Sequence, residues 1–135
     1  SLERKTPALE IQGDLTLVLK KGTESELLST DAALKKGAGT LTIRGEGSLR
    51  LQGETALEGE WKEETLNQDE PSALRIEGGK LVFTGEETAL YEDTVELAGG
   101  EIQIQCLNGK GTGIRAHTLD DRHFSGSLEM EESEE

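Results

Sequence analysis

Apolar and polar residues alternate along most of the chain in short stretches. Leu15, Leu17 and Leu19 form one such stretch. A period of two places every second side chain on the same face of a β-strand. The same alternation recurs at Leu9 and Ile11, Leu41 and Ile43, Leu49 and Leu51, Leu74 and Ile76, Leu81 and Phe83, Val95 and Leu97, and Ile102, Ile104 and Cys106. The pattern predicts an all-β chain of short strands, each with one buried face.

Glycine separates almost all of these stretches and predicts tight turns between the strands. Two glycine-rich segments also contain lysine: Gly78-Gly79-Lys80 and the sequence NGKGTG at 108–113. A phosphate-binding loop leads into a helix whose N-terminus faces the anion. Strand-like sequence follows both segments instead, so we interpret them as turns and expect Lys80 to point outward.

A longer period is visible in a small residue followed by Leu or Ile. The spacing between copies is about 16 to 25 residues, which is typical of one coil of a solenoid. The copies are Ala8-Leu9, Ala33-Leu34, Ala56-Leu57, Ala73-Leu74, Ala89-Leu90 and Gly113-Ile114. We therefore expect a β-solenoid of about five or six short coils, with aliphatic ladders pointing inward. In this interpretation, residues 73–90 close one coil of about 16 residues.

Three segments fit the coil pattern less well. Residues 24–37 place Leu27, Leu28 and Leu34 near helical spacing, so a helix is an alternative there. Residues 58–71 are charged and lack alternation, which indicates a loop or short helical excursion on the side of the coil. The acidic residues 131–135 are expected to form a frayed tail.

Composition narrows the classes of function. The 135 residues suit a single domain spanning 1–135. The net charge of −14 makes nucleic acid and anionic membrane surfaces unfavourable partners. The longest apolar run, 15–19, is far shorter than the roughly 20 residues of a membrane span. The single Cys106 rules out an intrachain disulfide, and we expect it to be a small buried residue. Only 3% of residues are aromatic, which favours a thin aliphatic core.

The candidate site residues are of types that bind sugars or metal ions. A sugar ring packs on an exposed aromatic face with polar groups around it, so Trp61 is the first candidate for ligand binding and Tyr91 the second. Calcium needs several oxygen ligands at one point. Asp93, Asp120 and Asp121 are the candidate metal ligands. The last two lie in the segment HTLDDRH, 117–123, which also suits proton transfer or a solvated loop.

Residues 9–53 resemble a known protein family. The segment runs through Gly22-Thr23, Asp31 to Leu34 and the strand LTIRGEGSL at 41–49. In this it is similar to bacterial carbohydrate-binding domain-containing proteins of parallel β-helix fold, found mostly in Firmicutes. The resemblance implies a right-handed parallel β-helix in a secreted or cell-surface protein, with plant polysaccharide and calcium as ligands. Thr55, Thr88 and Thr112 stand where that family tends to carry Asp-rich motifs.

Taken together, the sequence predicts a non-catalytic extracellular β-helix module that binds polysaccharide. Two other functions stay open. One is an enzyme of the polysaccharide lyase type, which would need a carboxylate such as Asp93 close to Arg75 and Arg115. The other is a structural or protein-interaction solenoid without a small ligand. The sequence leaves the glycan, the calcium dependence and the oligomeric state open.

Overall fold

A computed structural model describes residues 8–60, 72–108 and 111–132, and in these ranges all regular secondary structure is β. The strands are β1 (Leu9–Ile11), β2 (Leu15–Leu19), β3 (Glu24–Leu28), β4 (Ala32–Lys36), β5 (Gly39–Gly45), β6 (Ser48–Glu58), β7 (Ser72–Ile76), β8 (Lys80–Leu97), β9 (Glu101–Cys106), β10 (Thr112–Asp120) and β11 (Ser127–Glu132). Trp61 and residues 133–135 lie outside the described residues.

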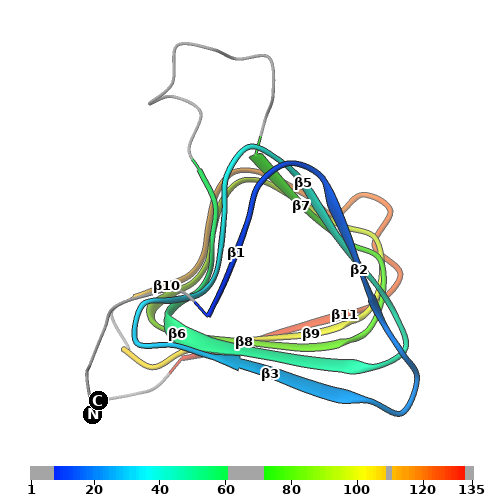
Figure 1. The fold of residues 1–135 in the computed structure, drawn as a ribbon, viewed down its shortest axis with the longest axis horizontal. Helices are drawn as coiled ribbons and strands as arrows, with labels where there is room; N and C mark the ends of the chain where they lie inside the picture. The colour runs from blue at the N-terminus through cyan, green and yellow to red at the C-terminus, as the bar shows by residue number, and fades with distance from the viewer. Residues whose placement is uncertain (1–7, 61–71, 109–110, 133–135) are drawn as a thin grey trace.

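The strands wind into a parallel β-solenoid with a triangular cross-section (Figure 1). Every strand pairing is parallel. Viewed down the axis, the chain runs clockwise as it recedes from the viewer, so the coil is right-handed (Figure 1). The expected fold class is confirmed: the chain makes about four turns from β1 to the fifth strand segment stacked on the same face, close to the five or six coils expected.

Three parallel sheets form the sides of the triangle, and long strands bend at the corners to join two or three of them. Face I contains β1, β4 and residues 55–58, 88–92 and 112–116. Face II contains β2, β5, β7 and residues 94–97 and 118–120. Face III contains β3, residues 48–53 and 80–85, β9 and β11.

Aliphatic side chains stack in register inside the triangle and form the core. On face I the ladder is Leu9, Leu34, Leu57, Leu90 and Ile114. Five of the six small-residue motifs found in the sequence therefore stack directly on one another. Face II stacks Leu15, Leu41, Leu74, Val95 and Leu119, and face III stacks Leu27, Leu51, Phe83, Ile104 and Met130. All three ladders are closed to solvent in the middle coils.

The sixth motif, Ala73-Leu74, belongs to face II, so the prediction that residues 73–90 close one coil is wrong. Leu74 pairs with Val95, whereas Leu90 pairs with Leu57 and Ile114. The chain between Leu74 and Leu90 crosses face III before it reaches face I. Similar dipeptides on two faces of the same coil produced the apparent short period.

The alternative of a helix at 24–37 is also wrong, because β3 and β4 occupy this segment. Leu27 pairs with Leu51 on face III, and Leu34 stacks between Leu9 and Leu57 on face I. The leucines that suggested one helical stripe therefore lie on two faces. Leu28 points away from both ladders and is 58% exposed.

The corner between faces II and III is a column of stacked glycine turns. Gly45, Gly79 and Gly100 adopt φ values of 110°, 101° and 97°, which favour glycine over residues with a side chain. A Cβ atom on Gly78 would lie 2.8 Å from the carbonyl oxygen of Gly45 in the preceding coil. The interpretation of Gly78-Gly79 as a turn is confirmed, and Lys80 is exposed just after it.

The ladder predicts a large effect of truncating Phe83, which is fully buried in the middle of the face III ladder. Phe83→Ala should lower the free energy of unfolding by about 3 to 5 kcal/mol, because the cavity cannot collapse between stacked coils. Val82→Ala, on the outward side of the same strand, should cost less than about 1 kcal/mol. Urea unfolding followed by circular dichroism measures both. Equal losses would contradict the assignment of the ladder.

Candidate functional site

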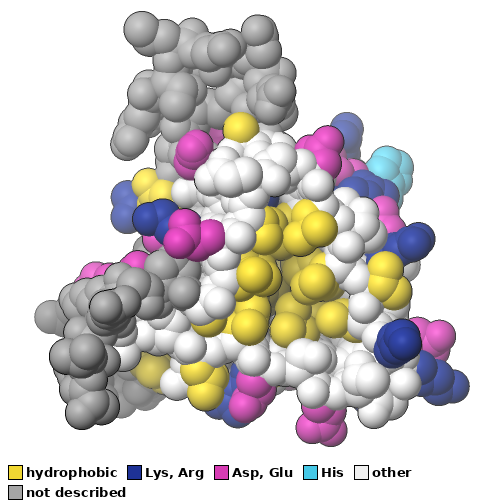
Figure 2. All heavy atoms as spheres, viewed as in Figure 1, with side chains coloured by type: hydrophobic (Ala, Val, Ile, Leu, Met, Phe, Trp, Pro, Cys, Tyr) yellow, Lys and Arg dark blue, Asp and Glu magenta, His cyan; other side chains and the backbone are white. Residues whose placement is uncertain are grey.

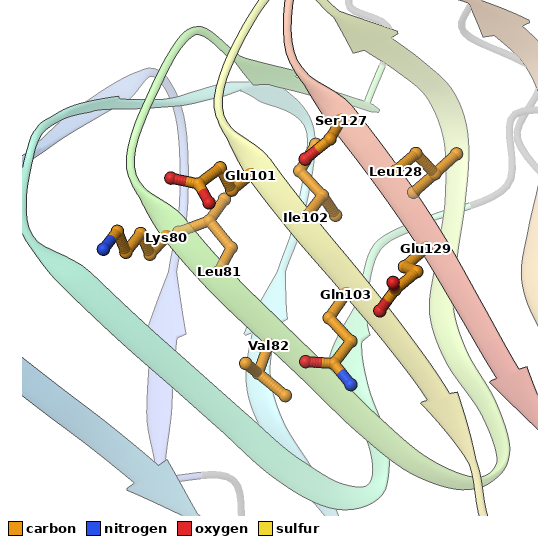
Figure 3. Close-up of a pocket in the computed structure, with 9 residues that line it drawn as sticks. All are labelled: Lys80, Leu81, Val82, Glu101, Ile102, Gln103, Ser127, Leu128 and Glu129. Atoms are coloured by element: carbon orange, nitrogen blue, oxygen red, sulfur yellow. The ribbon is translucent and has the colours of Figure 1, made fainter.

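The outer surface of face III carries a shallow groove. One hollow of about 420 Å³ lies over β8, β9 and β11, and a second of about 390 Å³ lies over β3, β6 and β8. Both hollows are lined by Lys80 and Val82, so they join into one surface across the five strands of the face. In Figure 3, Lys80, Val82, Gln103 and Glu129 rise from neighbouring strands on this surface.

Strict alternation gives this groove its polar chemistry, because the residues between the buried ladder positions all point outward. Arg50, Val82, Gln103 and Glu129 form one outward row, in register across four strands. The next outward position holds Thr84 and Gln105, whose side chains are joined by a 2.8 Å hydrogen bond from the hydroxyl to the amide oxygen; Thr84 is buried, and neither residue lines the two hollows. Neighbouring strands, and so neighbouring side chains within a row, are about 4.8 Å apart.

The charged groups of the groove differ in how they are held. Arg50 donates a 3.2 Å hydrogen bond to the amide oxygen of Gln52 and lies 3.8 Å from a carboxylate oxygen of Glu26. Among the residues that the structure describes, the ammonium group of Lys80 forms no ion pair. Lys80 also borders the glycine corner, where a further shallow hollow exposes backbone. It is therefore the cation of the groove that is best placed to meet a ligand.

A second polar assembly lies inside the corner between faces I and II. Lys36 and Glu92 are both buried, and the ammonium nitrogen of Lys36 lies 3.1 Å from Oε2 of Glu92. The same ammonium group donates to the carbonyl oxygens of Gly37 and Gly39, at 3.1 and 2.8 Å, and to the hydroxyl of Ser72 at 2.8 Å. Oε1 of Glu92 accepts a 2.8 Å bond from the amide of Asp93. These hydrogen bonds and the ion pair offset the cost of removing the two charged groups from water.

The coil between Lys36 and Glu92 makes room for this pair. Lys36 lies on β4 and Glu92 on β8, with the end of β6 between them. A Cβ atom on Gly59 would collide with the carboxylate of Glu92. Ser72, the first residue of β7, also accepts a 3.3 Å hydrogen bond from the amide of Glu60. The buried pair therefore sits directly behind the two residues that flank the segment 61–71.

Burial raises the pKa of Glu92 above its ordinary value, and the nearby charge of Lys36 opposes this shift. Oε2 of Glu92 lies within ion-pair distance of Lys36 but has no hydrogen bond of good geometry. The carboxylate is thus held by charge at one oxygen and by a hydrogen bond at the other. We expect the Lys36–Glu92 pair to favour one register of strand pairing between the coils more than it increases the net stability of the fold.

Asp93 and His117 form a pair at the same corner, one coil apart. Nδ1 of His117 lies 2.5 Å from Oδ1 of Asp93. Asp93 is 8% exposed, and its amide bonds to Glu92, so it links the buried pair to the surface. A carboxylate behind an imidazole fixes the orientation of the ring. The arrangement orients His117, and the described residues place no third metal-binding group beside it.

The predicted site residues are distributed over different parts of the coil. Trp61 lies outside the described residues. Tyr91 is half-buried on face I, and its carbonyl oxygen accepts a 2.6 Å bond from the amide of Gly59. Tyr91 is therefore close in sequence and space to the corner between faces I and II, away from the groove of face III.

The three aspartates proposed as metal ligands occupy two corners. Asp93 is paired with His117, whereas Asp120 is the last residue of face II and Asp121 follows it. Arg122 donates two hydrogen bonds to Asp120, at 3.0 and 2.9 Å, and these bonds lower the pKa of Asp120 to about 2. In the ranges 8–60, 72–108 and 111–132, no three His, Cys, Asp or Glu residues are grouped to hold a metal ion. A calcium site stays a prediction.

The arrangement expected of a lyase is not formed by Arg75. Arg75 donates to Glu77 at 2.6 Å and to Glu96, both on or beside face II, and these bonds raise its pKa. Asp93 instead bonds to His117. The guanidinium group of Arg75 is therefore engaged by two glutamates and not by Asp93.

Sequence reasoning missed the buried pair, although a signal was present. Lys36 lies two residues after Leu34, and Glu92 lies two residues after Leu90. Alternation places both on the inward side, where a charged residue is unusual. The equivalent position two residues after Leu57 is Gly59. An acid, a base and a glycine at the same inward position of three coils indicate a pair that meets across the glycine.

No protein-family model, no curated protein and no solved structure matches the chain. The described part of the structure contains no helix long and apolar enough to cross a membrane.

Breaking the buried pair should destabilise the protein more than replacing it. Lys36→Met leaves Glu92 without its cation and should cost about 3 to 5 kcal/mol of unfolding free energy at neutral pH. The double variant Lys36→Met with Glu92→Leu should recover most of that loss, because no uncompensated charge stays buried. Chemical denaturation of Lys36→Met, Glu92→Leu and the double variant measures the unfolding free energy of each. Additive losses would contradict direct coupling between the two side chains.

The raised pKa of Glu92 predicts a pH dependence of stability. The folded protein holds the proton of Glu92 more tightly than the unfolded chain does, so this group stabilises the fold most below its ordinary pKa of 4.5. The contribution is lost as the pH rises through the folded-state pKa. The unfolding free energy of the native chain minus that of Glu92→Gln should therefore increase as the pH falls from neutral toward 4.5. A difference that decreases over this range would contradict the shift.

Proposed function

We propose that the protein is a non-catalytic, secreted or cell-surface β-helix module that binds polysaccharide along face III. The observation that carries this proposal is the continuous groove across β3, β6, β8, β9 and β11. The groove is shallow and open, and it is lined by polar residues such as Lys80, Gln103 and Glu129 together with apolar residues such as Val82 and Leu128. Such a surface suits a long hydrated polymer better than a small enclosed ligand.

The spacing of the coils supports a polymeric ligand. A linear chain lying along the solenoid axis would cross strands about 4.8 Å apart. It would meet Arg50, the small apolar surface of Val82 and then Gln103, which are in register on successive strands. Amide, guanidinium and ammonium groups donate hydrogen bonds to sugar hydroxyls, and carboxylates accept them. The groove thus supplies both kinds of partner in a repeated arrangement.

The resemblance of residues 9–53 to carbohydrate-binding β-helix proteins supports the same class of ligand and the extracellular setting. Trp61 and Tyr91 stay candidate sugar platforms, and Tyr91 lies beside the corner between faces I and II. Calcium stays a candidate cofactor that the resemblance suggests. Each of these three points can be separated from the groove by experiment.

A glycan array, read with calcium and with a chelator, tests the proposal. We expect binding of the native protein to one class of polysaccharide and a weakening of roughly five- to 150-fold in Lys80→Ala with Gln103→Ala, because each of the two lost hydrogen bonds costs about 0.5 to 1.5 kcal/mol. Lys35→Ala, which removes an exposed lysine from face I, is the matched control and should bind normally.

Other outcomes of the same array are informative. Loss of binding in Trp61→Ala with normal binding in the groove variants would assign the ligand to Trp61 instead of the groove. Absence of binding to every glycan, with and without calcium, would refute the carbohydrate proposal. Release of unsaturated product from pectin would favour the lyase alternative over a binding module.

A further inference from the structure

The two ends of the solenoid expose the same ladders that are buried in its middle. Viewed down the axis from the first coil, hydrophobic side chains gather around a hollow at the centre of the end (Figure 2). The first coil contributes Leu9, Ile11, Leu17 and Leu27, which are only partly buried, and Leu15, which is 38% exposed. The last coil exposes Leu128, Leu119 and Met130 by 36%, 47% and 51%.

Strand edges are open at the same two ends. Within the described residues, β1, β2 and β3 each pair with one strand only, in the second coil. At the other end, β10 and β11 each pair with one strand, in the coil before them. An unpaired edge presents backbone N–H and C=O groups that can continue a sheet.

We propose that copies of this chain stack end to end, with the last coil of one copy on the first coil of the next. The occupant is a second copy because the chain itself presents both halves of the required contact. Each coil of the solenoid already rests on its neighbour through these three parallel sheets and three inward ladders. A last coil placed on a first coil continues every sheet in the parallel sense and every ladder on its own face.

The register between neighbouring coils within the chain predicts which residues would meet between two copies. Continuing the face I ladder places Ile114 of one copy on Leu9 of the next. Continuing faces II and III places Leu119 on Leu15 and Met130 on Leu27. The side chains that are most exposed at one end therefore meet partly exposed apolar side chains at the other. Burying them removes apolar surface from water, which drives association.

The rim charges set how tightly the ends fit. In this register Arg115 lies opposite Glu10 on face I, which is attractive. Glu129 lies opposite Glu26 on face III, which is repulsive. The net charge of −14 adds a general repulsion between copies. Salt screens both repulsions, so association should strengthen as the salt concentration rises.

A contact between different ends is heterologous, and this gives a sharp test. Leu17→Glu blocks the first coil with an inward charge, and Met130→Glu blocks the last coil. Each variant alone should be monomeric in sedimentation velocity, with a dissociation constant raised at least about tenfold. An equimolar mixture should form a one-to-one dimer, because each variant keeps one intact end. Val18→Glu, which adds a charge on the outward side of β2, should associate like the native chain.

The rim gives an independent variant that strengthens the contact. Glu129→Lys turns the repulsion with Glu26 into an attraction and should lower the dissociation constant by roughly two- to fivefold at low salt. Glu101→Lys makes the same change of charge on face III one coil further in, and it should have a smaller effect. Circular dichroism of each variant confirms that the coil is folded.

Two results would overturn the proposal. A native chain that sediments as a monomer at every protein and salt concentration would refute stacking. Persistent dimers of Met130→Glu alone, with loss of dimers in Leu17→Glu, would show that two first coils meet each other and would refute the head-to-tail arrangement. Failure of the glycan experiment leaves this test unaffected, because the deciding variants change Leu17 and Met130, and neither residue lines the groove of face III.

Discussion

The whole structure depends on the in-register stacking of inward aliphatic side chains between neighbouring coils. No single coil has a core of its own, since its Leu, Ile and Val side chains are covered only by the coils on either side. Each buried side chain contributes about 1.5 to 3 kcal/mol, against a backbone entropy cost of about 1 to 2 kcal/mol for every ordered residue. Sharing the ladder among coils makes a chain with only 3% aromatic residues foldable.

Because the ladder fixes the faces, variation is confined to the corners. Turns between faces differ in length, and one of them contains the segment 61–71, while the pairing of the strands on both sides keeps its register. The buried Lys36–Glu92 pair acts at such a corner. It joins the second and fourth coils across Gly59, and Lys36 also donates a hydrogen bond to Ser72, the first residue of β7. An apolar pair of similar volume could fill the same space, but a charged pair penalises any shift of register that would separate it.

The strands and their inward-facing residues could be predicted from the sequence, because the alternation of apolar and polar residues is a local pattern. The stacking of Ala33-Leu34, Ala56-Leu57 and Ala89-Leu90 could be predicted because these motifs share one face. The assignment of Ala73-Leu74 failed because a dipeptide carries no information about which face it lies on. Closing a coil requires the path through all three faces, and the corners that set this path have no fixed length.

The candidate sites were harder to predict than the fold for a related reason. Lys36 and Glu92 are distant in sequence, and the groove combines residues from five strands, so neither is a local motif. Tyr91 and Asp120 were predicted as site residues from their residue types alone, but the role of each side chain depends on its neighbours in the fold. Arg122 donates hydrogen bonds to the carboxylate of Asp120, and the imidazole of His117 is hydrogen-bonded to the carboxylate of Asp93.

The separation of inward and outward positions has a consequence for function in this architecture. Inward residues are constrained by the ladder, while outward residues on the same strands can change without loss of packing. On face III the two sets alternate strictly, from Leu49, Leu51 and Leu81 inside to Arg50 and Val82 outside. Ligand specificity can therefore evolve on a face while the fold is kept. The ends differ, because there the ladder itself meets solvent, and the same side chains that stabilise the coil are available for contact with another coil.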